Sequence, residues 1–144
     1  MSIIGYRSIS EDEFRTLMFS NNPIYGKRIW CNKEECGCPK TNYGVVCFFA
    51  EPWRWKDKLH QFDIVVNLKN PLKGHGKYLL SKESIKNKIW TGRDGQQEIL
   101  IPELYTRYYS LSDVISIDTH HYYNKEFTRK LIDICNKNNI NFLG

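Results

Sequence analysis

Short apolar runs separated by polar, turn-forming stretches set the pattern of this chain. Runs rich in β-branched and aromatic residues are typical of strands, whereas apolar residues three or four positions apart are typical of helices. The sequence therefore predicts strands at 3–8, 45–50, 61–68, 97–101 and 113–119. It predicts helices at 11–19, 81–87 and 123–136. Because strands and long helices do not alternate regularly, we expect an α+β domain with mainly antiparallel strands.

Helix starts and chain breaks carry their own signals. Ser10, followed by Glu13 three residues later, forms a capping-box pattern, so the first helix should begin directly after Ser10. Ser81 holds the equivalent position before the second helix. Proline, glycine and polar residues predict a long loop at 22–43, breaks at 71–76 and 92–95, a turn or short helix at 52–55, and a connection of undefined type at 105–111.

Composition indicates one folded domain. The 144 residues suit a single domain at 1–144, and a hydrophobic content of 41% is enough for a core. The longest apolar run, 45–50, is far too short to span a membrane, and the N-terminus lacks the pattern of a secretory signal. We therefore expect a cytoplasmic protein, or a toxin domain delivered into the cytoplasm of a target cell, without membrane association.

A net charge of +5 favours acidic partners, including nucleic acid. The lysines are scattered along the chain rather than clustered, for example at positions 56, 58, 69, 73, 77, 82, 86 and 88. A scattered set is typical of a solvated surface. A dedicated nucleic-acid surface is therefore an alternative and not the main expectation.

The chain has five cysteines. Cys31, Cys36, Cys38 and Cys47 could supply four thiolates to zinc, but structural zinc sites usually pair their cysteines two residues apart. Cys47 also falls within a predicted buried strand, where cysteine behaves as a small apolar residue. We expect reduced thiols and no metal, with a zinc site at these four cysteines as the alternative.

Residues 96–102 carry the clearest chemical signal, with the sequence Gln-Gln-Glu-Ile-Leu-Ile-Pro. Side chains alternate along a strand, so Gln96 and Glu98 should project from the same face. A carboxylate can stabilise a sugar carbon that passes through an oxocarbenium-like state, and an amide can orient a nucleophile without adding charge. The pair therefore favours chemistry at a glycosidic carbon.

This motif, together with Gly-Tyr-Arg-Ser at 5–8, resembles the ADP-ribosyltransferase superfamily. Its toxin-like members have an arginine on the first strand, a Ser-Thr-Ser strand in the middle, and a Gln-x-Glu motif near the C-terminal end. The resemblance spans roughly residues 3–118 and implies two packed, mostly antiparallel small sheets with peripheral helices and NAD in the cleft between them. The chain departs from the family at 44–50, which reads Gly-Val-Val-Cys-Phe-Phe-Ala and has no hydroxyl.

The resemblance also implies roles for individual residues. Glu98 would stabilise the ribosyl cation as nicotinamide leaves, and Gln96 would place the acceptor. Arg7 would hold the NAD pyrophosphate, for which a planar, permanently charged guanidinium is suited. The other implied residues are Tyr6 and Phe49 at the nicotinamide pocket, Trp53 and Arg54 as further NAD contacts, and Trp90 and Arg93 in acceptor recognition.

These residues together predict an NAD-dependent ADP-ribosyltransferase that transfers ADP-ribose from its substrate NAD to a protein or a nucleic acid. An NAD glycohydrolase, with water as the acceptor, is the nearest variant. The alternative of another class is a non-catalytic basic module that binds or inhibits nucleic acid or protein through Trp53, Trp55 and the lysines. His75, His120 and His121 have no carboxylate or cysteine at ligand spacing, so we expect them to be loop or strand-end residues.

Overall fold

Strands dominate the fold. The computed structural model describes residues 2–26, 44–56, 59–90, 95, 97–122 and 124–144. Its strands are β1 (Ser2–Ile9), β2 (Ile24–Tyr25), β3 (Val46–Phe49), β4 (Arg54–Trp55), β5 (Phe62–Lys69), β6 (Leu72–Leu80), β7 (Ile89–Trp90), β8 (Gln97–Thr106), β9 (Tyr108–Tyr109), β10 (Val114–Asp118) and β11 (Asn141–Phe142). Its helices are α1 (Glu11–Met18), α3 (Lys82–Asn87), the short 3-10 helix η3 (Leu111–Asp113) and α4 (Lys125–Lys137). The predicted α+β class is confirmed.

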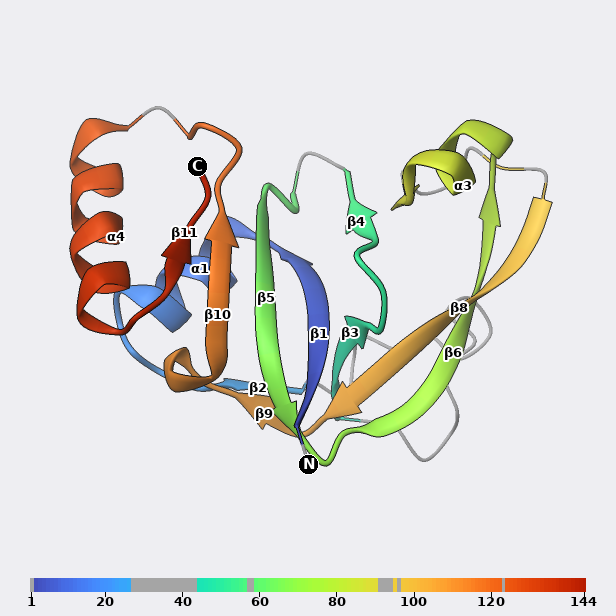
Figure 1. Ribbon diagram of the computed structural model, residues 1–144, viewed down its shortest axis with the longest axis horizontal. Coiled ribbons are helices and arrows are strands. Elements are labelled where there is room, and N and C mark those ends of the chain that lie inside the picture. The colour runs from blue at the N-terminus through green and yellow to red at the C-terminus, as the bar shows by residue number, and fades with distance from the viewer. Residues whose placement is uncertain (1, 27–43, 57–58, 91–94, 96, 123) are drawn as a thin grey trace.

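The main sheet has seven strands in the order β11-β10-β5-β1-β3-β8-β6, shown in Figure 1. Neighbouring strands are antiparallel, except for the parallel pair β10–β11. Two further sheets have two strands each, β2–β9 and β4–β7. This arrangement differs from the expected pair of packed small sheets. The long strand β8 pairs with β6 on one side and β3 on the other, which joins the strands into one sheet.

The helices α1 and α3 begin where the sequence predicts, whereas α4 begins at Lys125 rather than at residue 123. Ser10 caps α1 by accepting a hydrogen bond from the Glu13 backbone N–H at 3.2 Å, and Ser81 caps α3 by accepting from Ser84 N–H at 3.1 Å. Asn124 performs the same role for α4, accepting from Phe127 N–H at 3.0 Å. Each side chain satisfies a backbone donor that the helix itself leaves unpaired.

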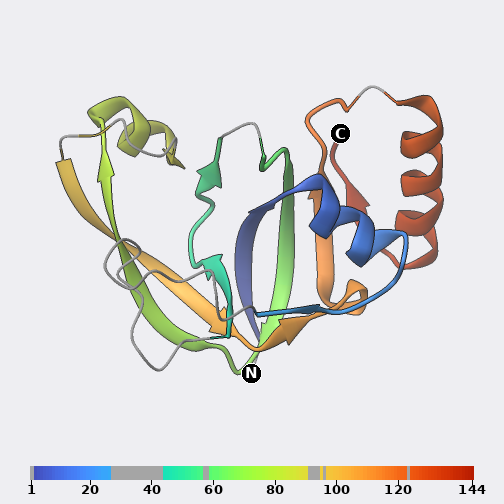
Figure 2. The same cartoon turned by 180° about the vertical axis from the view of Figure 1, so that it is seen from behind.

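The main core lies between the sheet and the helices α1 and α4 (Figure 2). Phe14 of α1 stacks on Phe62 of β5 with ring centroids 4.5 Å apart, and on Phe127 of α4 at 5.6 Å. All three rings are buried. Full burial of such a side chain contributes about 1.5–3 kcal/mol, so this aromatic stack fixes both helices on the sheet.

A second, smaller core lies on the opposite face of the sheet. Phe48 belongs to the main core, whereas its neighbour Phe49 belongs to the second one, as expected for successive strand residues. We call this second core the aromatic cluster; its buried members are Phe49, Trp53, Leu80 and Ile101, with Tyr6, Tyr78, Ile85, Trp90 and Ile99 packed against them.

The prediction of a break at 71–76 is wrong, because nearly all of it lies in β6, which pairs with β8 over nine residues. The glycines in this strand allow side chains of β8 to pass close by. A Cβ at Gly74 would lie 2.6 Å from Tyr105 Cε2, and one at Gly76 would lie 2.7 Å from Glu103 Oε1. Glycine here therefore marks close approach rather than a loop.

Other boundaries also differ. The predicted strand at 97–101 continues past Pro102 to Thr106, and 52–55 contains the strand β4 rather than a turn or short helix. The connection at 105–111 contains the end of β8, β9 and the start of η3. Of the predicted loop, 22–26 includes β2 and 27–43 lies outside the described residues, as does most of the predicted turn at 92–95. No described helix is long and apolar enough to cross a membrane.

Candidate functional site

Glu98 lies near the start of β8, opposite Leu79 of β6. Its side chain is 55% exposed, and its carboxylate lies 3.3 Å from the Nζ of Lys77. Exposed ion pairs of this kind hold their partners weakly, so the carboxylate is accessible to a ligand. Gln96 falls outside the described residues, and its expected alignment with Glu98 remains a prediction.

Glu98 and Arg7 project from the same face of the sheet. Ile99 and Tyr6 both pack on the aromatic cluster, so the residues next to them in sequence point the other way. The register pairs Tyr6 with Phe49, and Phe49 with Glu103. Glu98 precedes Glu103 by five positions, which is roughly 17 Å along a strand. The two predicted residues therefore share a face but are well separated.

The Arg7 side chain is held by a two-pronged ion pair with Glu13 of α1. Nε donates to Oε2 at 2.9 Å and Nη2 to Oε1 at 2.8 Å, while Nη1 donates to the carbonyl of Cys47 at 2.9 Å. Burial favours the neutral form of Arg7, but the charge and hydrogen bonds of Glu13 outweigh it and raise the Arg7 pKa. Arg7 thus fastens α1 to the sheet, and a phosphate would have to replace Glu13.

Glu13 has a second donor, the hydroxyl of Tyr109, at 2.5 Å. Burial would raise the Glu13 pKa, but the charge and hydrogen bonds of Arg7, together with the bond from Tyr109, lower it. Burial raises the pKa of Tyr109 well above its ordinary value. Arg7, Glu13 and Tyr109 thus form a hydrogen-bonded network inside the fold.

The predicted aromatic residues come together from distant parts of the chain. Tyr6, Phe49, Trp53 and Trp90 all belong to the aromatic cluster. The rings of Tyr78 and Trp90 are 5.3 Å apart in an edge-to-face arrangement, which is favourable for aromatic pairs. The structure therefore gathers the residues expected at the nicotinamide pocket and at the acceptor, but it places them as packing partners.

Glu103 is a buried carboxyl group that the sequence analysis missed. It is 3% exposed and accepts hydrogen bonds from the hydroxyls of Tyr78 and Tyr105, the latter at 2.8 Å. Burial raises its pKa, against the opposing effect of the two hydroxyls. Had β8 been extended past Pro102, alternation from Ile101 would have placed Glu103 on the inward face.

Arg54, expected among the NAD contacts, lies at another site. Its Nε is 2.8 Å from Oδ2 of Asp63, and its Nη2 is 3.1 Å from Nε2 of His120. His120 Nε2 lies 2.5 Å from the same Asp63 oxygen, while Ser8 Oγ donates to Oδ1 at 2.5 Å. Ser8 also accepts from the Trp55 N–H at 3.0 Å. Asp63 is therefore the common partner that fixes Arg54 and His120.

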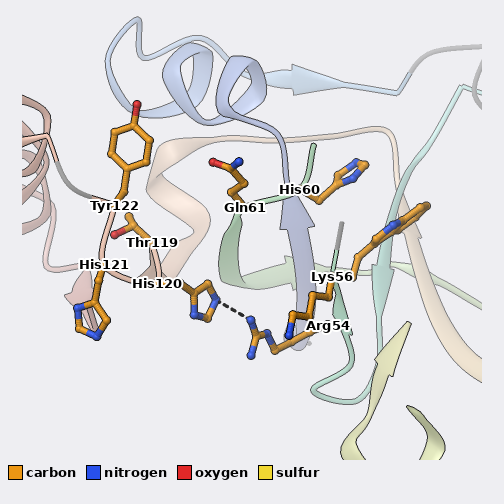
Figure 3. A pocket seen from close by; sticks show the side chains of 9 residues that line it. Arg54, Lys56, His60, Gln61, Thr119, His120, His121 and Tyr122 are labelled. Carbon is orange, nitrogen blue, oxygen red and sulfur yellow. Dashed lines mark hydrogen bonds between the residues drawn. The ribbon is translucent and has the colours of Figure 1, made fainter. Parts of the chain in front are cut away.

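A pocket of about 400 Å³ opens beside this cluster (Figure 3). Three segments form it: β4 with the residue after it, the residues before β5, and the residues after β10. It is lined by Arg54, Trp55, Lys56, His60, Gln61, Thr119, His120, His121 and Tyr122. We call it the basic pocket, because this lining contains arginine, lysine and histidine but neither aspartate nor glutamate.

His120 has carboxylate partners in the structure that the sequence spacing did not indicate. Besides Asp63, it contacts Asp118, whose Oδ1 accepts from the His120 backbone N–H at 2.8 Å. His120 and His121 follow β10 as expected but have φ angles of 51° and 61°, in the left-handed region. Two successive residues there store backbone strain, which often accompanies functional sites. Asp63 is 57 positions away in sequence, so local spacing could not reveal it.

Several predicted residues lie outside the described residues, namely Arg93, Cys31, Cys36 and Cys38. Cys47 lies on β3 as a partly buried free cysteine. Within the described part of the chain, no group of three or more histidine, cysteine, aspartate or glutamate residues is arranged to hold a metal ion. Zinc at the four cysteines remains an untested alternative.

Compared with models of known protein families, with curated proteins and with solved structures, the chain finds no match in any of the three. Its function therefore has to be argued from its own residues.

Proposed function

We propose that this protein is an NAD-dependent ADP-ribosyltransferase that cleaves the bond between ribose and nicotinamide and passes ADP-ribose to a macromolecule. The observation that carries the proposal is the strand order β1-β3-β8. These three strands hold the Arg7 motif, the middle segment and the Glu98 motif, and they are neighbours in the sheet although their sequences are far apart. Under this proposal the fold is a variant of the ADP-ribosyltransferase fold in which β8 joins β6 to β3 within one large sheet.

The exposed Glu98 supports this function. A carboxylate at the start of a strand, paired on the surface with Lys77, can approach a ribose without first breaking a buried contact. Its negative charge would stabilise the positive charge that develops on the ribose carbon as nicotinamide leaves. In this scheme Gln96 orients the acceptor, and Arg7 takes the pyrophosphate only after Glu13 releases it.

Two alternatives rest on specific observations. An NAD glycohydrolase would use the same Glu98 with water as the acceptor. A non-catalytic binding module is favoured by the closed Arg7–Glu13 pair and by the absence of hydroxyl groups in the segment 44–50. The glycohydrolase differs from the transferase in its acceptor, and the binding module performs no reaction on NAD.

The test is release of nicotinamide from NAD by the wild type and by Glu98→Gln, with and without a cell lysate as a source of acceptors. Glu126→Gln is the matched control, because Glu126 is also exposed and paired with a lysine, Lys130, at 3.6 Å. We expect Glu98→Gln to lower the rate by about 100-fold or more, as for loss of a group that stabilises transition-state charge. The Glu126 variant should retain the wild-type rate.

Dependence on the lysate identifies a transferase, and release without it identifies a glycohydrolase. A wild type that neither releases nicotinamide nor gains thermal stability from NAD would refute the proposal and leave the binding module. Equal activity of the Glu98 and Glu126 variants would remove Glu98 from the mechanism.

A further inference from the structure

The basic pocket is lined by side chains that can bind an anion. Two of its lining residues, Arg54 and Lys56, are basic, and three others are histidines. The nearby carboxylates are already engaged: Asp63 binds Ser8, Arg54 and His120, and Asp118 binds the backbone of His120. The inner surface of the pocket therefore presents cations and N–H groups rather than carboxylates.

Arg54 has a guanidinium with five N–H donors, and its contacts with Asp63 and His120 in the described structure involve Nε and Nη2. Its buried Nε is close to Asp63 as an ion pair, yet in the described structure it makes no hydrogen bond. Its Nη2 faces Nε2 of His120, a ring nitrogen that can either accept from Arg54 or donate to Asp63 but cannot do both. The Arg54 side chain is nevertheless 43% exposed. Its guanidinium can therefore still donate hydrogen bonds to an anion in the pocket.

The position of Arg54 is fixed before any ligand arrives. Asp63 holds its Nε side, while β4, which contains Arg54, pairs with β7. Ser8 links Asp63 to β4, because its hydroxyl donates to Asp63 and also accepts from the Trp55 backbone N–H. A guanidinium held in this way loses little freedom on binding, and its planar edge fits two oxygens of a phosphate.

Aromatic rings border the same pocket. Trp55 stacks on His60 at 4.7 Å and meets Trp90 edge-to-face at 3.8 Å. Tyr122 lies on the opposite wall, fixed by a hydrogen bond from its hydroxyl to Glu11 at 2.9 Å. Flat rings beside a cationic centre suit a base joined to a phosphate. A volume of about 400 Å³ is in the range of pockets that hold small organic ligands.

We propose that the basic pocket binds the phosphate group of a nucleotide, with Arg54 and Lys56 contacting the phosphate and Trp55 the base. The nucleotide is either part of NAD or part of a nucleic acid. The site does not depend on Glu98 chemistry, because it is formed by β4 with the residue after it, by the residues before β5 and by the residues after β10. A phosphate site here persists even if the chain has no activity toward NAD.

Calorimetric titration at low ionic strength with inorganic phosphate and with AMP tests the proposal. We expect saturable binding of both, tighter for AMP, and weaker at high salt. Arg54→Gln should weaken both by about tenfold or more, because a charge-assisted hydrogen bond is lost. Lys56→Gln, at an exposed position that tolerates change, should also weaken both ligands.

Arg15→Gln is the matched control, because Arg15 is 45% exposed and ion-paired with Glu11, against 43% for Arg54. No saturable binding to the wild type, or equal losses in the Arg54 and Arg15 variants, would overturn the proposal. Competition experiments against bound AMP show whether the natural nucleotide belongs to NAD or to a nucleic acid. Displacement of AMP by NAD indicates a dinucleotide, whereas displacement by a 5′-phosphorylated oligonucleotide but not by NAD indicates a nucleic acid.

Discussion

Arg7 on β1 and Glu13 on α1 form a two-pronged, largely buried ion pair with N–O distances of 2.9 and 2.8 Å. The first strand and the first helix are thereby joined directly, only six positions apart in sequence. Glu13 also supplies the backbone N–H that Ser10 caps, so one residue serves both the helix start and its attachment to the sheet.

Removing one partner of this pair should be costly. We expect Glu13→Gln to lower the free energy of unfolding by about 3–5 kcal/mol, because it leaves the Arg7 charge buried without compensation. Urea denaturation of the variant against Glu126→Gln, which breaks an exposed pair, measures the effect. The double variant Arg7→Met, Glu13→Leu should recover much of the loss. A loss below about 1 kcal/mol would show that Arg7 is free to take other partners.

Glu103 should make stability depend on pH in an unusual direction. Its pKa is raised in the folded state, mainly by burial. At pH values above the ordinary pKa of glutamate, the folded protein therefore binds more protons than the unfolded chain. Its contribution to stability is therefore lost as pH rises through the raised pKa. We expect Glu103→Gln to gain melting temperature relative to the wild type as pH increases from about 4 to 8. A constant difference across this range would contradict the assignment.

Substitution of Gly76 should destabilise the protein, although Gly76 lies on the edge strand β6. A Cβ there would lie 2.6 Å from Tyr78 Cε2 and 2.7 Å from Glu103 Oε1, well inside contact distance. We expect Gly76→Ala to destabilise the protein by about 1–3 kcal/mol, as overpacking commonly does. Thermal unfolding measures it, and Lys77→Ala on the same strand is an exposed control. A variant as stable as the wild type would mean that the Tyr78 and Glu103 side chains move aside freely.

Local signals in the sequence were enough for much of the fold. Ser10 and Ser81 start helices where predicted, because a cap depends on residues a few positions apart. The strand β6 was missed because Gly74 and Gly76 resemble a loop, and only the neighbouring side chains of β8 explain them. Glycine occurs both in turns and where a neighbouring side chain packs closely on the backbone, and the sequence alone does not distinguish the two.

The candidate sites were harder to predict, because their contacts join residues that are far apart in the sequence. Glu98 lies on a strand as predicted, and its catalytic role stays a prediction. Arg7 was expected to hold a phosphate, whereas its partner in the structure is Glu13. The partners of His120 include Asp63, which reaches it only through the pairing of β5 with β10. Such contacts depend on the register between strands, which the local patterns used to predict each strand do not reveal.

Ser8 provides the most specific test of how the basic pocket is assembled. Its buried hydroxyl donates to Asp63 and accepts from the Trp55 backbone N–H, so Ser8→Ala leaves that N–H without its acceptor. We expect a loss of about 1–3 kcal/mol in the free energy of unfolding. Ser116→Ala, at a similarly buried serine on β10, controls for removal of a hydroxyl and should cost less. If the pocket binds phosphate as proposed, Ser8→Ala should also weaken that binding, because Asp63 no longer fixes Arg54 firmly. Equal stability of the two serine variants would show that Ser8 does not connect β4 to the sheet.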